Sequence, residues 1–209
     1  MANHCAGIVL CGGRSSRMGR PKALLPFGPE LMLQRVVRLM GEVVQPLIVV
    51  AAPGQELPPL PRDVTVVRDR REGRGPLEGL AAGVAALPGQ ATAAYATSCD
   101  VPLLRPAFVR RMIELHAGYE IAVPLSGGFY HPLAAVYSKT VLPHIERLLG
   151  EDRLRPVYLF ETAQTRVVAE HELRGVDPEL ASLRNLNQPA DYQAALAEAG
   201  LPPQDMPST

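Results

Sequence analysis

The segment between Gly7 and Lys22 holds the residues whose types and spacing most clearly suggest chemistry. A short apolar stretch, Ile8 to Cys11, ends at Gly12-Gly13, and a polar loop with a third glycine, Gly19, follows. The same segment carries four cationic side chains: Arg14, Arg17, Arg20 and Lys22. A buried strand that leads into a glycine-rich loop brings backbone N–H groups close to phosphates. Since the cations would neutralise several phosphate charges at once, we predict that this loop binds a triphosphate.

The loop differs in spacing from two better-known phosphate-binding loops. It has no Gly-Lys-Ser or Gly-Lys-Thr ending, which excludes the P-loop of the Walker type. Its glycines, Gly12, Gly13 and Gly19, do not follow the Gly-x-Gly-x-x-Gly pattern of a dinucleotide-binding fold. A surface turn with incidental arginines is the alternative interpretation.

Two further polar signals follow predicted strands. Asp69 comes just after the strand 64–67, and Asp100 follows the strand 93–97 and precedes Val101-Pro102. Ligands of open α/β sheets bind at the carboxyl ends of the strands, so we expect both carboxylates to lie beside the glycine-rich loop. A carboxylate in the position of Asp100 can hold a magnesium ion on phosphate oxygens. A helix cap is the alternative role for Asp100.

The elements that must position these residues alternate along the chain. Predicted strands cover 8–11, 46–50, 64–67, 93–97, 121–123, 133–137 and 166–169. Predicted helices cover 31–40, 77–84, 106–112, 141–149 and 157–162, and a last helix follows Pro189. Continuous apolar strands separated by helices favour an α/β fold with a doubly wound, mostly parallel sheet and helices on both faces. We expect one domain over residues 1–200 and a disordered tail over 201–209.

Composition excludes several classes of protein. The 209 residues are 47% apolar and 20% charged, and 21 cationic side chains balance 21 anionic ones, which argues against a nucleic-acid binder. No apolar run reaches membrane-spanning length and the first residues do not form a signal peptide, so we expect a cytoplasmic protein without membrane contacts. The cysteines, Cys5, Cys11 and Cys99, form no Cys-x-x-Cys pair and are interpreted as small buried hydrophobes.

The run from Leu10 to Lys22 resembles the nucleotidyltransferase signature Leu-x-Gly-Gly-x-Ser-x-Arg-Met-Gly-x-x-Lys, and with Ala23-Leu24-Leu25 it is most similar to the molybdenum cofactor guanylyltransferases. The similarity extends, with gaps, to Tyr192. The later matching motifs are Asp69 before Gly75-Pro76-Leu77-Glu78-Gly79, Cys99-Asp100-Val101-Pro102, His131-Pro132, and Asn185-Leu186-Asn187-Gln188-Pro189-Ala190-Asp191. The resemblance implies a Rossmann-like nucleotidyltransferase fold.

Site roles follow from the resemblance. It implies that the nucleotide is bound by Leu10, Cys11, Gly12, Gly13, Lys22, Asp69 and Asp100. Catalysis would depend on Lys22, Arg17 and Asp100, and Mg²⁺ on Asp100 with Asn187. The candidates for binding the acceptor are Arg153, Arg155 and Asn185.

The implied reaction transfers GMP from GTP to the terminal phosphate of molybdopterin, with or without molybdenum, and releases pyrophosphate. Contacts with other molybdenum cofactor proteins are also implied. The attacking phosphate monoester has a second pKa of about 6 and needs no general base at neutral pH.

Departures from the family pattern leave alternatives open. Cys11 stands where alanine is common, Glu78 replaces a small residue, and Pro21 precedes Lys22 where guanylyltransferases often have Asp. Since Pro-Lys is familiar from molybdenum cofactor cytidylyltransferases, one alternative is the same transfer with CTP or to another phosphorylated acceptor. A nucleotide-binding protein without catalysis is the other alternative.

Overall fold

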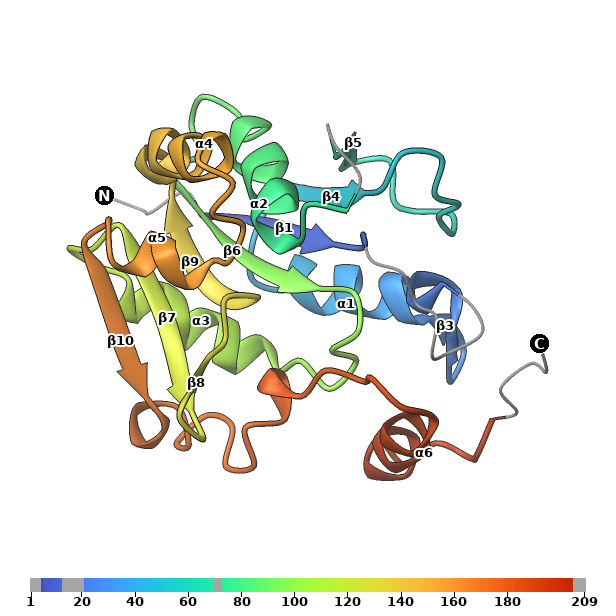
Figure 1. Ribbon diagram of the computed structural model, residues 1–209. Coiled ribbons are helices and arrows are strands. Elements are labelled where there is room, and N and C mark those ends of the chain that lie inside the picture. The colour runs from blue at the N-terminus through green and yellow to red at the C-terminus, as the bar shows by residue number, and fades with distance from the viewer. Residues whose placement is uncertain (1–4, 13–20, 70–72, 205–209) are drawn as a thin grey trace.

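The computed structural model describes residues 5–12, 21–69 and 73–204 (Figure 1). Within these residues the central sheet has eight strands in the order β10-β7-β9-β6-β1-β4-β5, with β8 paired to β7. Their bounds are β1 (Cys5–Leu10), β4 (Leu47–Ala51), β5 (Val64–Arg68), β6 (Ala93–Ser98), β7 (Ile121–Ser126), β8 (Phe129–Tyr130), β9 (Ala134–Ser138) and β10 (Thr165–Ala169). A separate hairpin consists of β2 (Pro26–Phe27) and β3 (Glu30–Leu31).

Helices connect the strands as the sequence pattern predicts. The α-helices are α1 (Met32–Gly41), α2 (Pro76–Ala85), α3 (Pro106–Leu115), α4 (Leu142–Gly150), α5 (Val157–Phe160) and α6 (Pro189–Glu198). Short 3₁₀ turns occur at η1 (Lys22–Leu24), η2 (Lys139–Val141), η3 (Glu170–Glu172) and η4 (Ala181–Leu183). Every predicted helix and strand is present within a few residues of its expected bounds, and the proline-rich segment 55–61 is irregular.

The sheet is covered on both faces because its central strands are apolar on both. In β1, Val9 belongs to a core cluster with residues of α1 and α3, while Ile8 belongs to a second cluster with residues of α2 and α4. Every residue of β1 and β6 is buried. Figure 1 shows α2 and α4 on one side of the sheet and α1 and α3 on the other. The predicted doubly wound α/β fold is therefore confirmed.

One long strand of the sheet runs against the others. β9 is antiparallel to both β6 and β7, whereas β1, β4, β5 and β6 are parallel. The connection from β7 to β9 is too short for a parallel crossover, which needs a dozen or more residues. Because β9 is reversed, its first residue, Ala134, pairs with Thr97 near the carboxyl end of β6. The His131-Pro132 turn before β9 thus lies at the carboxyl edge of the sheet.

A third apolar cluster fixes the C-terminal segment. Tyr192 and Leu196 of α6 are buried against Phe27 of the β2–β3 hairpin, and the Tyr192 hydroxyl donates to the Pro26 carbonyl. Leu201 packs against the same cluster, while residues 205–209 lie outside the described part, so the expected disordered tail stays a prediction. This packing brings the chain back from the far side of the molecule to the carboxyl edge of the sheet.

Candidate active site

A lysine, an aspartate and an asparagine from distant parts of the chain meet at the carboxyl edge. Lys22 Nζ donates to Asp100 Oδ2 at 2.6 Å and to Asn187 Oδ1 at 3.0 Å. Lys22 begins the 3₁₀ turn after the glycine-rich loop, and Asp100 stands two residues beyond the end of β6. The side chains of Lys22 and Asp100 are 18% and 11% exposed, so solvent screens their ion pair only in part.

The second carboxylate oxygen of Asp100 is also occupied. Asn185 Nδ2 donates to Asp100 Oδ1 at 2.8 Å and to Ser98 Oγ at 2.9 Å, and the Ser98 hydroxyl donates to the same Asp100 oxygen. The Leu186 N–H donates to the Asp100 carbonyl at 3.0 Å. These bonds hold the late asparagine segment against the end of β6 and fix the orientation of the Asp100 carboxylate.

Asn187 is fixed by the start of α6. Asp191 Oδ2 accepts the backbone N–H groups of Asn187 at 3.0 Å and Gln188 at 2.8 Å. Pro189 occupies the first turn, where its missing N–H costs no helical hydrogen bond. The Asn-x-Asn-x-Pro-x-Asp pattern can therefore be explained physically. Its Asp and Pro stabilise the start of α6, and the start of α6 fixes the position of Asn187 beside Lys22.

The side-chain oxygen atoms at this edge are suitable ligands for a hard divalent cation. Asp100 Oδ2 and Asn187 Oδ1 both lie within 3.0 Å of one ammonium nitrogen, so two oxygen ligands already converge on one cationic position. Mg²⁺ prefers oxygen ligands and is commonly held by one or two carboxylates together with substrate phosphates. In the described ranges no group of three or more His, Cys, Asp or Glu side chains could hold a metal ion. Asp100 and Asn187 would therefore leave ligand positions open to phosphates and water.

The end of β1 forms the neighbouring wall. The Leu10 carbonyl accepts a hydrogen bond from the Cys99 N–H at 3.0 Å. The Cys11 carbonyl accepts one from Gln55 Nε2 at 3.1 Å, and the Cys11 N–H donates to the Val50 carbonyl at 2.8 Å. A carbonyl oxygen has two lone pairs, so both carbonyls can still accept a bond from a ligand. The backbone of residues 10–11 is therefore rigid and retains acceptors.

Asp69 faces this wall between two glycines. A Cβ atom placed on Gly12 would lie 3.0 Å from Asp69 Oδ2, and one on Gly79 would lie 3.4 Å from Asp69 Oδ1 and 2.9 Å from Leu10 Cδ2. Larger residues at either position would press on the carboxylate or on Leu10. The two glycines thus let the end of β1, the first turn of α2 and Asp69 approach closely.

The carboxylate of Asp69 lies in an unfavourable environment for a charge. Burial raises its pKa above the usual range, and the negative charge of Glu78 raises it further. Among the residues that the structure describes, Asp69 Oδ1 finds no hydrogen-bond donor. Glu78 is buried in the first turn of α2, with its Oε2 3.6 Å from Arg74 Nε. Because Asp69 Oδ1 is buried, its missing partner adds to the cost of the charge and is not by itself a contact point for a ligand.

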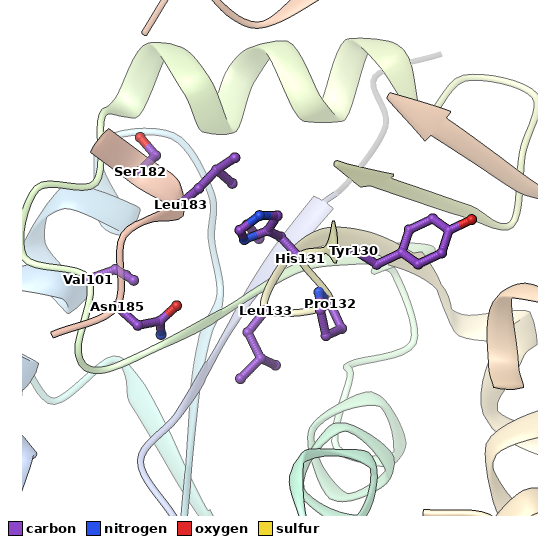
Figure 2. A pocket seen from close by; sticks show the side chains of 9 residues that line it. Val101, Tyr130, His131, Pro132, Leu133, Ser182, Leu183 and Asn185 are labelled. Atoms are coloured by element: carbon purple, nitrogen blue, oxygen red, sulfur yellow. The ribbon is translucent and has the colours of Figure 1, made fainter. Parts of the chain in front are cut away.

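A pocket of about 190 Å³ adjoins the asparagine segment. It is lined by Val101, Tyr130, His131, Pro132, Leu133, Ala134, Ser182, Leu183 and Asn185. Figure 2 shows His131, Pro132 and Leu133 between Asn185 on one side and Tyr130 on the other. Since Asn185 also contacts Asp100, the pocket opens next to the cluster that can hold a cation.

The buried Asp177 holds one wall of this pocket in place. Its carboxylate accepts the N–H groups of Ala181 and Ser182 at 3.0 and 2.8 Å and lies 3.2 Å from Arg105 Nε. The Ser182 hydroxyl in turn accepts the Arg105 N–H at 3.0 Å. The 3₁₀ turn η4, which ends at Leu183, is therefore well anchored.

The structure brings most of the predicted site residues together. Lys22, Asp100, Asn185 and Asn187 form one hydrogen-bonded cluster, and Leu10, Cys11, Gly12 and Asp69 form the adjacent wall. Gly13 and Arg17 lie outside the described residues, and their predicted roles stay predictions.

The two predicted acceptor arginines do not line the pocket. Arg153 lies over the ring of Tyr158 at 4.2 Å and pairs with Glu151 and Glu161, and Arg155 is exposed at the approach to α5. No finding tests their predicted contact with the acceptor.

Some residues of the site carry no signal in the sequence. Gln55 supports the Cys11 carbonyl from a proline-rich connection, and nothing in its neighbours predicts that contact. The wall at Ser182 and Leu183 comes from a segment without periodicity.

The interpretation of the cysteines as buried residues is confirmed. Cys5, Cys11 and Cys99 are all buried. Burial raises the pKa of the Cys5 thiol to about 12, and the contact with Cys99 together with burial raises the pKa of the Cys11 thiol.

A mostly parallel sheet with polar side chains gathered at its carboxyl edge is the arrangement in which open α/β proteins bind their ligands. Residues 7–167 match the MobA-like NTP transferase domain, and the chain belongs to this family. A probable molybdenum cofactor guanylyltransferase of Pelotomaculum thermopropionicum is 37% identical over 190 residues, which are 90% of each chain.

Solved structures share the fold. Molybdopterin-guanine dinucleotide biosynthesis protein A from Archaeoglobus fulgidus superposes with a TM-score of 0.77 at 19% identity, over 93% of this chain and 98% of that one. A Mycobacterium tuberculosis H37Rv protein, solved in complex with manganese, has a TM-score of 0.59 at 26% identity over 81% of this chain and 89% of that one.

The described residues include no helix long and apolar enough to cross a membrane.

Proposed function

We propose that this protein transfers GMP from GTP to the terminal phosphate of molybdopterin, with or without bound molybdenum, and releases pyrophosphate. The observation that carries the proposal is the convergence of Lys22, Asp100 and Asn187 at the carboxyl edge, directly beside Asp69 and the end of β1. Support also comes from the curated relative named as a guanylyltransferase at 37% identity.

The nucleotide lies across the end of β1 in this proposal. Guanine carries adjacent N–H donors at N1 and N2 and an acceptor at O6. In this proposal Asp69 Oδ2, on the Gly12 side, accepts from N1 and N2, whereas Asp69 Oδ1 is buried on the Gly79 side. The carbonyls at Leu10 and Cys11 can accept as well, and Glu78 behind Asp69 strengthens the negative character of this wall. Lys22 contacts the phosphates.

Mg²⁺ is the proposed cofactor, held by Asp100 and Asn187 with the phosphates. When bound, it neutralises charge that develops on the transferred and departing phosphates. A relative in this fold was solved with manganese, another divalent cation that oxygen ligands suit. With Asp100 and Asn187 serving as ligands of the cation, Lys22 would be available to bind phosphate oxygens of the nucleotide.

The chemical step needs alignment more than proton transfer. A dianionic phosphate oxygen of the acceptor attacks the α-phosphorus of GTP, a new P–O bond forms, and the bond to the β-phosphate oxygen breaks. The electron pair of that bond leaves with pyrophosphate. Because the nucleophile is already deprotonated at neutral pH, no side chain of this site has to act as a base.

Pyrophosphate release tests the proposal. Purified protein with GTP, MgCl₂ and molybdopterin should release pyrophosphate, and omission of either MgCl₂ or the acceptor should abolish the signal. Asp100→Asn keeps the size of the side chain but removes the charge, and we expect turnover to fall about 100-fold or more. The exposed Asp152→Asn is the matched control and should retain normal turnover. Acceptor-dependent turnover in Asp100→Asn at the wild-type rate would contradict the assigned role.

A further inference from the structure

The pocket beside Asn185 has the size and chemistry of a site for a small ring system. Its volume, about 190 Å³, equals roughly six water molecules at about 30 Å³ each. Val101, Leu133 and Leu183 supply apolar walls, whereas the polar groups that line it are few. Small-molecule sites commonly combine apolar walls with a small number of fixed polar groups that determine orientation.

His131 is the polar ring in the middle of the pocket wall, as Figure 2 shows. Its backbone is held on two sides: the His131 N–H donates to the Pro124 carbonyl at 2.9 Å, and the His131 carbonyl accepts the Ala134 N–H at 3.1 Å. The next carbonyl, that of Pro132, accepts the Tyr137 hydroxyl at 2.7 Å. The turn that carries the imidazole is therefore rigid, and the ring is placed by the fold.

The state of the imidazole follows from its surroundings. Burial lowers the pKa of His131, while hydrogen bonding to the Ser126 backbone and the charge of Glu170 act in the opposite direction with smaller effect. The direction of the Ser126 effect fits a ring N–H that donates toward the Ser126 backbone carbonyl. The second nitrogen of a neutral imidazole is then an acceptor.

The position of the pocket relative to the cation cluster determines what can bind there. Asn185 lines the pocket and donates to Asp100, so a ligand in the pocket can extend a phosphate to the metal-binding edge. The nucleotide wall at Asp69 and Gly12 is a separate set of residues, none of which lines the pocket. The pocket therefore suits the second substrate.

We propose, on the basis of the function proposed above, that this pocket holds the planar heterocycle of the acceptor and that His131 accepts a hydrogen bond from a ring N–H of that heterocycle. A pterin fits this description, because its pyrimidine half carries a lactam N–H and an amino group. Leu133 and Leu183 contact the faces or edges of the ring, and the phosphate lies toward Asn185. His131 is thus a binding residue for the acceptor that fixes the orientation of its ring.

Direct binding tests the inference without turnover. Free pterin, a fluorescent heterocycle without a phosphate, is titrated into wild-type protein, His131→Ala, His131→Gln and the control His171→Ala, whose histidine is exposed on η3. We expect wild-type protein and the control to bind pterin alike and His131→Ala to bind it about 10-fold or more weakly, the effect of one lost bond to a buried group. His131→Gln should recover part of the affinity, because its amide oxygen is an acceptor.

Kinetics then separate this inference from the proposed function. In His131→Ala the KM for the phosphorylated acceptor should rise about 10-fold or more, while the Kd for GTP stays within about twofold of wild type. Equal pterin affinity in wild type and His131→Ala, or equal losses for pterin and GTP, would overturn the role of His131. Absence of acceptor-dependent pyrophosphate release from the wild type would instead overturn the proposed function, whatever the pterin titration gives.

Discussion

At the scale of single residues, the site is a set of oxygens arranged around one ammonium group. Lys22 Nζ contacts both Asp100 and Asn187, which holds two potential metal ligands in place before any substrate binds. In the function that we propose, the Lys22 ammonium group also binds phosphate oxygens of the nucleotide. One lysine would then both stabilise the free site and bind the substrate.

The first prediction concerns Lys22. Lys22→Ala should weaken GTP binding by about 10- to 150-fold, because a charge-assisted contact to phosphate contributes about 1.5–3 kcal/mol. The loss for GMP should be smaller, since GMP lacks the outer phosphates. Lys139→Ala is the control: its Nζ donates to the Leu87 carbonyl, and GTP affinity should not change. Isothermal titration measures all four affinities, and equal losses for GTP and GMP would show that Lys22 does not contact the polyphosphate.

The second prediction concerns the effect of the Asp69 charge on the free energy of unfolding. Its pKa in the folded protein is raised by burial and by Glu78, so the folded state binds more protons than the unfolded state above a pH of about 4. The destabilising contribution of Asp69 to the free energy of unfolding should therefore disappear as the pH falls through its raised pKa. Asp69→Asn removes the charge and should unfold at a higher urea concentration than wild type at pH 7, with the difference shrinking toward pH 4.

The control for Asp69→Asn is the exposed Asp63→Asn, which should leave stability at pH 7 unchanged. The same Asp69→Asn protein should bind GTP more weakly, because an amide cannot accept from both N1 and N2 of guanine. A variant that is less stable than wild type at pH 7 would contradict this account of Asp69.

At the scale of elements, close packing of α2 on β1 positions the nucleotide wall. A Cβ atom on Gly83 would lie 2.7 Å from Ile8 Cγ2, and one on Gly79 would lie 2.9 Å from Leu10 Cδ2. Both partners are buried side chains of β1. The two glycines, one helical turn apart, let the helix lie against the strand so that its first turn reaches Asp69.

The third prediction tests this packing. Overpacking of Gly83→Ala against Ile8 should cost about 1–3 kcal/mol, and the gain in helix propensity is about 1 kcal/mol. We therefore expect the free energy of unfolding to fall by up to about 2 kcal/mol. Gly41→Ala, at the end of α1, is the matched control: the nearest atom is Leu47 Cδ1 at 3.7 Å, so it should be neutral or slightly stabilising. Urea unfolding followed by circular dichroism gives both values. If Gly83→Ala were as stable as Gly41→Ala, the close approach would not be structurally required.

The sequence predicts the elements better than their directions. Apolar runs such as 46–50 and the helical spacing of 77–84 identify elements because burial on both faces of a strand leaves a continuous apolar signal. Nothing in the run 133–137 distinguishes a parallel from an antiparallel strand, and the two-residue strand at Phe129–Tyr130 is too short for periodicity. Yet the reversal of β9 is what brings His131 to the site.

The same limit applies to the candidate site. Strand-end position alone predicts that Asp69 and Asp100 lie close to the end of β1, because parallel strands end at one edge. Asn185 and Asn187 reach that edge only through the packing of α6 on the β2–β3 hairpin, a long-range contact that no local pattern shows. Their roles were therefore predicted from the family resemblance, and the side-chain contacts of Ser98 and Gln55 were not predicted at all.

At the scale of the whole molecule, the carboxyl edge of the sheet has two separate regions, to which we assign the two proposed substrates. The nucleotide wall lies at the ends of β1 and β5, and the proposed acceptor pocket lies at the start of β9 and along the 182–185 segment. Lys22, Asp100 and Asn187 stand between these two regions. This arrangement suits a reaction in which two bound phosphates must meet, because neither substrate has to move once both are in place.

The choice of nucleotide tests the central claim most directly. Cytosine offers one exocyclic amino donor and two acceptors, so its acceptor at N3 would face the Asp69 carboxylate and leave polar groups unsatisfied at about 1–3 kcal/mol each. The measurement is pyrophosphate release with GTP or CTP, separately and in competition, at equal MgCl₂ and saturating molybdopterin. We predict that GTP turnover exceeds CTP turnover about 10-fold or more and that CTP competes poorly. CTP turnover equal to or above that of GTP would contradict the assignment of this protein as a guanylyltransferase.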